Sequence, residues 1–476
     1  MEIVGRKDEQ DVLAQAMESQ KPEFIVVYGR RRVGKTYLIK EYFNNQFAFY
    51  ASGIPDQKSN KAKIKTFYES LKNYGDKASK APEDWYEAFR RLRDILNDPN
   101  VYRDPVSDKR VVFLDEVPWF DNKQGLFREA LDFFWNTWAS SQPDLCLIVC
   151  GSATSWITKE ILLSKGGFYN RLTRIINLKP FTLKECELFY SAHGANITQS
   201  DIVKSYMVFG GIPYYINLYD TRMSLDQNID ALLFNPAGQL KNEYDMLFKS
   251  LFANPHNHYE IIEALSKKKS GMTRTELSAK TGINNGRALT DVLFDLEQCG
   301  FIRSYSTYKK DKNGKIYQII DPYILFYFAF LHNSKISKWT EHIGKPGYYT
   351  WLGLSFEKVC LWHVDEIKSV LGISGISSSE YAWRSDGSDN LKGAQIDLLI
   401  DRADNVINLC EMKYTESPFV ITDDYCNELL NKKTLFKEKT KTKKGIQIIL
   451  ISMNGVANNQ KYSIAQRVIN GAELFS

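Results

Sequence analysis

The chain has 476 residues, of which 43% are hydrophobic, 13% aromatic and 25% charged. These values are typical of a soluble globular protein, and the length fits about three domains. The net charge of +5 is too small to identify a nucleic-acid partner, and it permits one only if the basic residues cluster.

Cysteines and apolar runs exclude three further classes of protein. The seven cysteines are scattered without a CxxC pair, so we expect neither a disulfide framework nor a zinc site. The N-terminus, MEIVGRKDEQ, is charged from its second residue and is unlike a signal peptide. The longest apolar run, at 322–331, has about half the length that a membrane span needs. We therefore expect a cytoplasmic protein without a membrane partner.

The first motif in the chain is a phosphate-binding loop. Residues 24–28 predict a buried strand, and GRRRVGKT at 29–36 fits GxxxxGK[ST] between that strand and an amphipathic helix. Such a loop wraps its backbone round phosphates, and the helix N-terminus offers free N–H groups. We expect Lys35 to reach the β- and γ-phosphates and Thr36 to hold Mg²⁺. The predicted ATP-binding residues here are Gly29, Arg30, Arg31, Arg32, Val33, Gly34, Lys35, Thr36 and Tyr37.

Two later strands end on polar residues. The strand at 111–116 ends on Asp115, predicted to bind Mg²⁺ through water, and Glu116, predicted to polarise the attacking water. The next strand, at 145–150, runs into Gly151 and Ser152. Ser152 is predicted either to lie near the γ-phosphate or to cap the helix that follows, and both interpretations remain open.

Arg171 and Arg174 precede Pro180 and are candidates for a further catalytic role. Either could contact a γ-phosphate in the same or a neighbouring subunit, the second case requiring a homo-oligomer. We retain Arg171 as the catalytic candidate, although an ordinary surface ion pair is the favoured alternative.

Together these motifs resemble the archaeal-type AAA+ ATPase family. The resemblance rests on residues 4–9 (VGRKDE), 29–36, 114–119 (LDEVPW), 151–152 and 210–214 (GGIPY). It implies ATP hydrolysis in an α/β core, a small helical lid after Pro180, and Gly5 and Arg6 close to the adenine end of the nucleotide. One departure is the lid segment around GGIPYYI, which has no arginine in the usual second-sensor place.

Residues 255–325 predict three short helices followed by a hairpin, which is the order of a winged helix. The start of the third helix would offer Asn284, Asn285 and Arg287 to the DNA major groove. The wing would offer lysines to phosphates, namely Lys309, Lys310, Lys312 and Lys315. The alternative is a winged helix that serves as a protein–protein spacer.

Residues 395–414 (QIDLLIDRADNVINLCEMKY) predict two strands joined by a turn. Asp397 then lies opposite Cys410 or Glu411, and Lys413 shares the face of Glu411. Two acids and a lysine suit Mg²⁺-dependent phosphodiester hydrolysis, in which the acids hold the metal and the lysine steadies the attacking water or the charged transition state. An ordinary cross-strand ion pair is the alternative.

The C-terminal segment resembles the PD-(D/E)xK nuclease superfamily. By position, Glu357 is the helix acid, Asp397 the middle acid, and Glu411–Lys413 the ExK, with Ile396 where the family has proline. The resemblance implies Glu357, Asp397 and Glu411 as metal ligands. The lysine-rich run at 431–444 would face nucleic acid, or would be a solvated loop.

The predicted architecture is α/β: a P-loop AAA+ parallel-sheet core (1–180), a helical lid (181–240), a winged helix (241–335) and an α/β restriction-endonuclease-like domain (336–476). The predicted function is ATP hydrolysis with Mg²⁺, the nucleotide state controlling DNA binding or cleavage by the C-terminal half. The alternative is an ATP-dependent switch or scaffold that binds a protein partner, with a catalytically inert nuclease fold.

Overall fold

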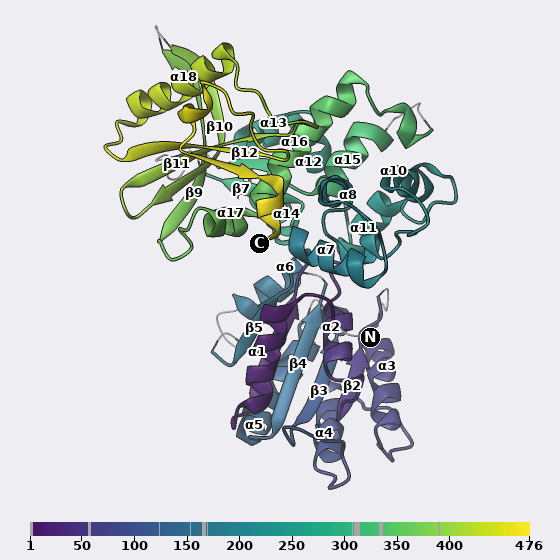
Figure 1. Cartoon of the computed structure of the whole chain (residues 1–476). Coiled ribbons are helices and arrows are strands. Elements are labelled where there is room, and N and C mark those ends of the chain that lie inside the picture. Colours follow the sequence, from purple (N-terminus) through teal and green to yellow (C-terminus); the bar gives the residue numbers. More distant parts are fainter. Residues whose placement is uncertain are drawn as a thin grey trace. The chain divides into compact units, whose positions relative to one another are not determined.

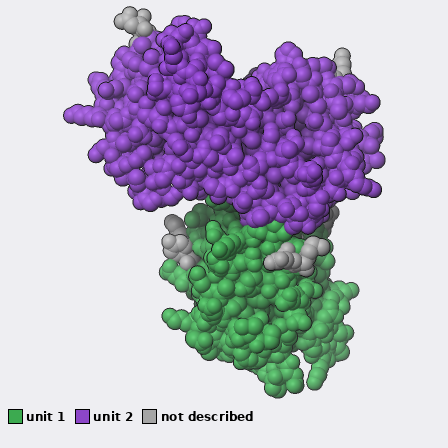
Figure 2. Space-filling model, viewed as in Figure 1, with its two compact units in different colours: residues 1–180 green, residues 181–476 purple. Residues whose placement is uncertain are grey.

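The computed structural model describes residues 3–55, 59–122, 124–152, 154–163, 168, 170–306, 308, 315–332, 337–388 and 391–476. The chain divides into two compact units, residues 1–180 and residues 181–476, which Figure 2 colours separately. In the described part of the chain, every helix is too short or too polar to cross a membrane.

Unit 1 is built on a five-stranded sheet in the order β2-β3-β4-β1-β5. All its strand pairs are parallel, which confirms the α/β class predicted for this part. The strands are β1 (Glu23–Tyr28), β2 (Phe49–Ser52), β3 (Arg110–Asp115), β4 (Leu145–Gly151) and β5 (Arg174–Asn177). The helices are α1 (Lys7–Glu18), α2 (Lys35–Tyr42), α3 (Asn60–Asn73), α4 (Trp85–Leu96), α5 (Leu126–Thr137) and α6 (Thr154–Trp156).

Both faces of this sheet are covered by helices (Figure 1), which is why its strands are continuous apolar runs rather than alternating ones. On one face, Phe24 and Val26 of β1 join a core with Phe67 of α3, Trp85 of α4 and Phe127 of α5. Elsewhere on the sheet, α1 contacts β5 and α2 contacts β4. Burial on both sides fixes the strand ends, and the loops that follow them, in place.

Unit 2 begins with helices and continues into two sheets. Its helices are α7 (Leu183–Ala192), α8 (Gln199–Phe209), α9 (Pro213–Ile216), α10 (Leu225–Ile229), α11 (Glu243–Leu251), α12 (His256–Ser266), α13 (Arg274–Thr281), α14 (Arg287–Gln298), α15 (Pro322–Phe326), α16 (Pro346–Trp362), α17 (Val364–Val370) and α18 (Asp423–Thr440). Its strands are β6 (Met272–Thr273), β7 (Ile302–Tyr305), β8 (Ile316–Ile319), β9 (Ser378–Ser388), β10 (Leu391–Arg402), β11 (Val406–Lys413), β12 (Gly445–Ser452) and β13 (Arg467–Asn470).

The two sheets of unit 2 differ in size and direction. The small one is antiparallel, in the order β6-β8-β7; β6 lies between α12 and α13 in the chain, and β7 and β8 follow α14. The large one has the order β13-β12-β11-β10-β9, with an antiparallel half (β9, β10, β11) and a parallel half (β11, β12, β13). Helix α18 buries Leu429, Leu435 and Phe436 against this sheet.

Tyr308, just after β7, links the small sheet to the large one. Its side chain is 4% exposed and belongs to the same core as Trp383 of β9 and Phe436 of α18. Its ring lies 5.1 Å from that of Phe436, and its backbone N–H donates to the carbonyl of Ala382 over 3.4 Å. The β7–β8 hairpin is therefore anchored in the core of the large sheet.

Candidate ATP site and acid cluster

The strand order of unit 1 brings three polar strand ends together. Strand β4 lies between β1 and β3, and all three run in the same direction. Parallel strands end at one edge of a sheet, where open α/β folds bind their ligands. The phosphate-binding loop after β1, the acids Asp115 and Glu116 after β3, and Ser152 after β4 consequently meet at this edge.

The phosphate-binding loop depends on glycine at its entrance. Gly29 has φ 149°, and a Cβ there would come within 2.2 Å of the Leu178 carbonyl oxygen. At the other end, Gly34 (φ 91°) caps the start of α2. Between them the Lys35 ammonium donates to the carbonyls of Gly29 and Arg30, both over 2.9 Å. Lys35 thus lies inside the loop, at the N-terminus of a helix, where a phosphate would bind.

Thr36 and Asp115 are in direct contact. The Thr36 hydroxyl donates to Oδ2 of Asp115 over 2.9 Å. Burial and the neighbouring Glu116 raise the pKa of Asp115, and hydrogen bonds from Thr36 and Cys150 oppose that rise. A hydroxyl and a carboxylate are the hard oxygen ligands that Mg²⁺ prefers, and a bound cation would favour the ionised carboxylate. These residues fit the predicted magnesium.

Glu116 is held from the neighbouring strand. Its Oε2 accepts hydrogen bonds from the backbone N–H and the hydroxyl of Ser152, over 3.1 and 2.9 Å. Its own backbone has φ 48°, a left-handed conformation that non-glycine residues adopt mainly where the surrounding structure enforces it. Ser152 therefore contacts Glu116, the predicted catalytic acid, and its two predicted roles stay predictions.

The remaining predicted ATP-binding residues lie in or beside the loop. Arg6 is buried, has φ 58° and donates to the carbonyl of Val33 over 3.1 Å, so it supports the loop from the N-terminal segment. The carbonyl of Gly5 accepts from Gln10. Of the others, Arg30 and Val33 are buried, Arg31 and Arg32 are partly buried, and Tyr37 is exposed.

Arg171 and Arg174 each form an ion pair within unit 1. Arg171 pairs with Asp132 in the middle of α5, and both side chains are more than a quarter exposed. Arg174 lies 3.4 Å from Glu23. These contacts are the ion pairs of the favoured alternative, whereas a catalytic role for Arg171 stays a prediction.

The hairpin β10–β11 brings Asp397 beside Glu411. Leu398 pairs with Cys410, so the next position along the ladder joins these two acids. Glu357, on α16, completes the predicted trio. Burial and the charges of Asp397 and Glu411 raise the pKa of Glu357 to about 7, against the opposing effect of Lys358 and Lys413. The three acids are therefore electrostatic neighbours, and they are called the acid cluster below.

Each acid of the cluster already has a partner in the protein. Glu411 accepts from Lys432 over 2.8 Å, and Asp397 accepts from the Gln395 amide over 2.8 Å. Glu357 lies 3.8 Å from Lys358. Among the residues that the structure describes, no three His, Cys, Asp or Glu side chains are placed to hold a metal ion. The acid cluster does not fit the predicted metal in this arrangement.

Lys413, the predicted catalytic lysine, lies 4.7 Å above the ring of Tyr425 rather than against either strand acid. The cation that does contact Glu411 is Lys432, which the sequence interpretation placed in a surface run. A signal for it exists: Leu429, Lys432 and Phe436 follow helical spacing, so Lys432 shares the buried face of α18.

Arg303 of β7 is a second residue that sequence reasoning missed. It donates to Oε1 of Gln318 over 3.0 Å and lies 4.7 Å above the Tyr305 ring. Burial lowers the pKa of Arg303, and the charges of Asp397 and Glu357 oppose that shift. The charges of Asp397 and Glu357 therefore act on Arg303, which lies in the small sheet.

The predicted DNA-contacting residues are exposed where the structure describes them. Asn284 and Asn285 precede α14, and Arg287, its first residue, has a side chain that is 94% exposed. Arg274 donates to the side chain of Asn285, which fixes this loop. Lys315 is exposed, whereas Lys309, Lys310 and Lys312 lie outside the described residues. In the lysine-rich run the exposed members are Lys437, Lys439, Lys441 and Lys443.

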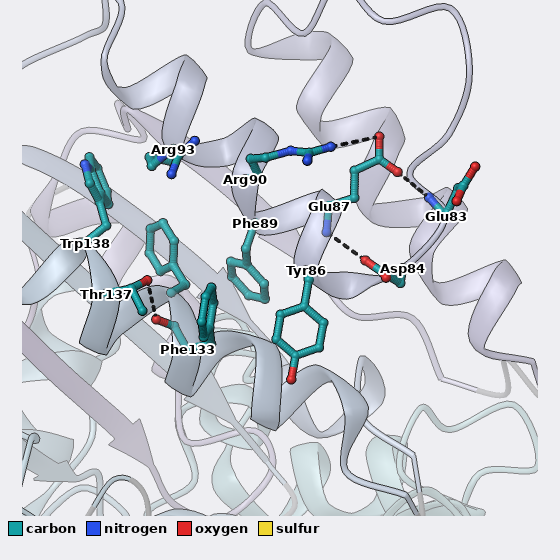
Figure 3. Close-up of a pocket in the computed structure, with 11 residues that line it drawn as sticks. Glu83, Asp84, Tyr86, Glu87, Phe89, Arg90, Arg93, Phe133, Thr137 and Trp138 are labelled. Atoms are coloured by element: carbon teal, nitrogen blue, oxygen red, sulfur yellow. Dashed lines mark hydrogen bonds and ion pairs between the residues drawn. The ribbon is translucent and has the colours of Figure 1, made fainter.

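Unit 1 also has a groove between α4 and α5, with a volume of about 470 Å³ (Figure 3). Tyr86 and Phe133 line it with rings 5.5 Å apart, and they are 46% and 54% exposed. Arg90 and Arg93 lie along the same helix as Tyr86. The groove is thus an exposed aromatic surface flanked by two arginines and by the acids Glu83, Asp84 and Glu87.

Comparisons with known proteins bear on both units. An uncharacterized protein of Methanocaldococcus jannaschii, MJECL04, is 27% identical over 369 residues, which are 75% of this chain and 76% of that protein. The uncharacterized ATP-binding protein MJ0423 of the same organism is 46% identical over 44 residues, 9% of this chain and 75% of that protein.

Two solved structures align with part of the chain. The Walker-type ATPase PABY2304 of Pyrococcus abyssi has a TM-score of 0.48 and 17% identity, and the match covers 69% of this chain and 96% of that one. The ORC2 protein of Aeropyrum pernix has a TM-score of 0.41 and 11% identity, with 69% and 93% covered.

A family described as an ATPase domain predominantly from Archaea matches residues 3–218, which include the phosphate-binding loop, Asp115, Glu116 and Ser152. This match agrees with the geometry at the edge of the parallel sheet. Residues 3–218 are therefore similar to the ATPase domains of this predominantly archaeal family, which supports an ATP-binding ATPase.

Proposed function

We propose that the protein hydrolyses ATP with Mg²⁺ at the loop of unit 1 and couples its nucleotide state to DNA binding by unit 2. The observation that carries the first part is the network at the sheet edge. Lys35 lies within the loop, Thr36 donates a hydrogen bond to Asp115, and Ser152 donates one to Glu116. A phosphate-binding cation, a pair of metal ligands and an oriented carboxylate are the parts that ATP hydrolysis requires.

Each residue then has a distinct task. When ATP binds, the Lys35 ammonium leaves the loop carbonyls and contacts the β- and γ-phosphates. The N–H groups at the N-terminus of α2 donate hydrogen bonds to the same phosphates. Thr36 and Asp115 would hold Mg²⁺, which would supply positive charge to the phosphates. Glu116 orients the attacking water and accepts its proton, while Ser152 keeps the carboxylate in position.

Steady-state ATP hydrolysis by the full-length protein tests this assignment. Glu116→Gln should retain ATP binding and lose roughly 10²- to 10⁴-fold in kcat, the usual contribution of a general base. Lys35→Ala should lose ATP binding itself. The matched control is Glu129→Gln, an exposed acid on α5, which should behave like the native protein. Full activity in Glu116→Gln would contradict the proposal.

The second part, DNA binding, is supported by the charge and exposure of unit 2. We interpret α12 to α14 with the β7–β8 hairpin as a winged helix, and residues 336–476 as a nuclease-like fold. Arg287 and the exposed lysines of the run at 431–444 would contact DNA phosphates. The run contains seven lysines and one acid, Glu438. We do not propose cleavage, because the acid cluster does not fit a metal.

Binding of a fluorescent duplex by the full-length protein, measured across salt concentrations with ATP or ADP, tests this part. Replacing Lys437, Lys439, Lys441 and Lys443 by glutamine should weaken binding and reduce the log–log salt slope, by up to about 0.9 for each phosphate that a lysine no longer neutralises. Lys267→Gln, which changes an exposed lysine of unit 2 already paired with Glu263, is the control. An affinity that is independent of nucleotide would contradict the coupling.

A protein partner is the second candidate, and the groove between α4 and α5 favours it. Exposed Tyr86 and Phe133 present apolar surface beside Arg90 and Arg93, a combination common at protein interfaces. The test is cross-linking of the native complex in cells with the double variant Tyr86→Ser/Phe133→Ser as the control. Loss of one specific partner in that variant, together with no DNA binding, would favour this candidate over the first.

A further inference from the structure

Cations from four separate elements lie around the acid cluster. Lys358 comes from α16, Lys432 from α18 and Arg303 from β7, and Lys413 of β11 adds a fourth. Lys358 and Lys413 oppose the burial that raises the pKa of Glu357, and Lys432 and Lys413 oppose the burial that raises the pKa of Glu411. A catalytic metal site of two or three acids needs one such lysine, so this cluster holds more positive charge than that role requires.

Lys432 makes a shorter ion pair with the acids than Lys358 does, at 2.8 Å against 3.8 Å. Its ammonium lies 2.8 Å from Oε2 of Glu411, and both side chains are almost fully buried, with 12% and 8% exposed. Its second partner is Glu428, one helical turn earlier, at 3.2 Å. A divalent metal would need to bind oxygen at about 2.0–2.1 Å in the place this ammonium holds, and would be repelled by it.

Among the described residues, Asp397 is held by a hydrogen bond from an amide side chain rather than by an ion pair. Its Oδ1 accepts from the Gln395 amide over 2.8 Å, within its own strand. Arg303 and the almost fully buried Lys358 contribute positive charge nearby, and Asp397 opposes the burial that lowers the pKa of both cations. Buried charges persist when they are paired, and the cations here perform that role for the acids.

The position of Arg303 is fixed by independent packing. Tyr308, five residues later in the chain, is inserted between Phe436 of α18 and Tyr381 of β9, with ring distances of 5.1 and 5.4 Å. Trp362, at the end of α16, donates to the Ile320 carbonyl just after β8 over 3.0 Å. The β7–β8 hairpin is thereby attached to α16, which carries Glu357, to α18, which carries Lys432, and to β9.

We propose that the acid cluster is a metal-free ion-pair junction, in which Lys432, Lys358 and Arg303 supply the positive charge that a divalent metal supplies in a nuclease. The junction ties α16, α18 and the β7–β8 hairpin to the β10–β11 hairpin. This inference rests on the proposed nuclease-like fold of residues 336–476. It is independent of ATP hydrolysis and DNA binding, whose assays fail or succeed separately.

Manganese binding tests the proposal directly. Mn²⁺ would be titrated into the full-length, nucleotide-free protein and followed by electron paramagnetic resonance, in an Asp115→Asn background that removes a ligand of the ATP-site metal. We expect the background protein and its Asp397→Asn derivative to bind the same amount of Mn²⁺. Bound Mn²⁺ that disappears on Asp397→Asn would overturn the proposal.

A double-mutant cycle tests the junction without any metal. Lys432→Met should lower the Tm markedly, because it leaves Glu411 buried and unpaired, and Glu411→Gln together with Lys432→Met should restore part of that loss. Lys432→Arg, which keeps the charge, should lie close to the native protein. The control pair is Lys267→Met with Glu263→Gln, whose 2.7 Å ion pair is 59% and 44% exposed and should show no coupling. An unchanged Tm in Lys432→Met would contradict the junction.

The same cycle applied to Arg303→Met and Asp397→Asn measures the contribution of the hairpin. We expect a coupling between these two residues, since each compensates the charge of the other across the two sheets. Independent, additive effects of the two substitutions on Tm would show that Arg303 is not part of the junction.

Discussion

Ser152 donates two hydrogen bonds to one carboxylate oxygen of Glu116, from its backbone N–H over 3.1 Å and from its hydroxyl over 2.9 Å. The contact joins the tip of β4 to the tip of β3. It restricts a side chain whose backbone already has the unusual φ of 48°. The orientation of the proposed general base is therefore set by a residue that itself takes no part in proton transfer.

This relationship gives the first prediction. Ser152→Ala removes the hydroxyl bond and keeps the backbone bond, so one neutral-to-charged hydrogen bond of about 1.5–3 kcal/mol is lost. If that bond orients Glu116 in the transition state, kcat should fall by roughly 10- to 100-fold with little change in ATP affinity. Measurement of kcat and of nucleotide Kd separates the two effects. A loss of ATP affinity at constant kcat would assign Ser152 to nucleotide binding instead.

The second prediction concerns the entrance to the phosphate-binding loop. Gly29→Ala should destabilise unit 1 and prevent ATP binding, because the new Cβ would meet the rigid Leu178 carbonyl at 2.2 Å. Gly194→Ala is the matched control: Gly194 also has positive φ, at 72°, but a Cβ there meets nothing within 4 Å. The control should lose only about 1–2 kcal/mol of unfolding free energy, the cost of a left-handed backbone conformation for alanine. Equal Tm losses in the two variants would contradict the steric argument.

The third prediction is a pH dependence of stability through His363. This side chain is 1% exposed; Nε2 accepts from the Leu183 N–H over 2.9 Å, and Nδ1 donates to the Val359 carbonyl over 2.7 Å. Burial lowers the pKa of His363 to about 4, below the ordinary 6.5 of the unfolded chain. Between pH 4 and pH 6.5, His363 is therefore protonated in the unfolded state and neutral in the folded state. Stability is fully present above pH 6.5 and declines as the pH falls towards 4, by about 3 kcal/mol in total.

Urea unfolding of unit 2 between pH 7.5 and 4 measures this effect. Because carboxylates titrate in the same range, the informative quantity is the difference between the native protein and His363→Gln. Glutamine retains an acceptor for the Leu183 N–H and cannot titrate, so its curve should be flatter. His193→Gln, at an exposed histidine of the same unit, should follow the native protein. Parallel curves for the native protein and His363→Gln would contradict the prediction.

The fourth prediction tests the anchor of the β7–β8 hairpin. Tyr308→Ala should destabilise unit 2 by about 3–5 kcal/mol, the usual effect of removing a large buried aromatic side chain. Tyr308→Phe keeps the ring contacts with Tyr381 and Phe436 and should lose far less. Denaturant unfolding of both variants checks this, with ATP hydrolysis by unit 1 expected to continue. Tyr308→Ala as stable as Tyr308→Phe would show that the hairpin is not anchored through its ring.

Local patterns were enough to propose the candidate ATP site, because its residues lie in a few short segments of the chain. The spacing of Gly29, Lys35 and Thr36 defines a loop between a strand and a helix, and Asp115 ends an apolar strand. The sheet order that unites them follows from burial on both faces. For the hairpin at 395–414, alternation and turn length limited the partner of Asp397 to two residues, and the register selects Glu411.

What the sequence did not reveal depends on contacts between distant segments. Lys432 reads as one lysine in a charged run, and only the helical spacing with Leu429 and Phe436 separates it from its exposed neighbours. Arg303 and Tyr308 lie on a predicted wing, where cationic and aromatic residues suit DNA as well as they suit a protein core. No local pattern shows that this hairpin packs on β9 and α18.

The hydrogen bond between Leu183 and His363 has a consequence for synthesis on the ribosome. All five strands of the first sheet have been made by residue 177, so unit 1 can fold while the chain still grows. The first amide of α7, in contrast, waits for an acceptor 180 residues further on. At ordinary translation rates that interval is roughly 10 to 40 s. Throughout it, unit 1 is complete while α7 lacks this acceptor, so the hydrogen bond at the start of unit 2 forms only after residue 363 has been made.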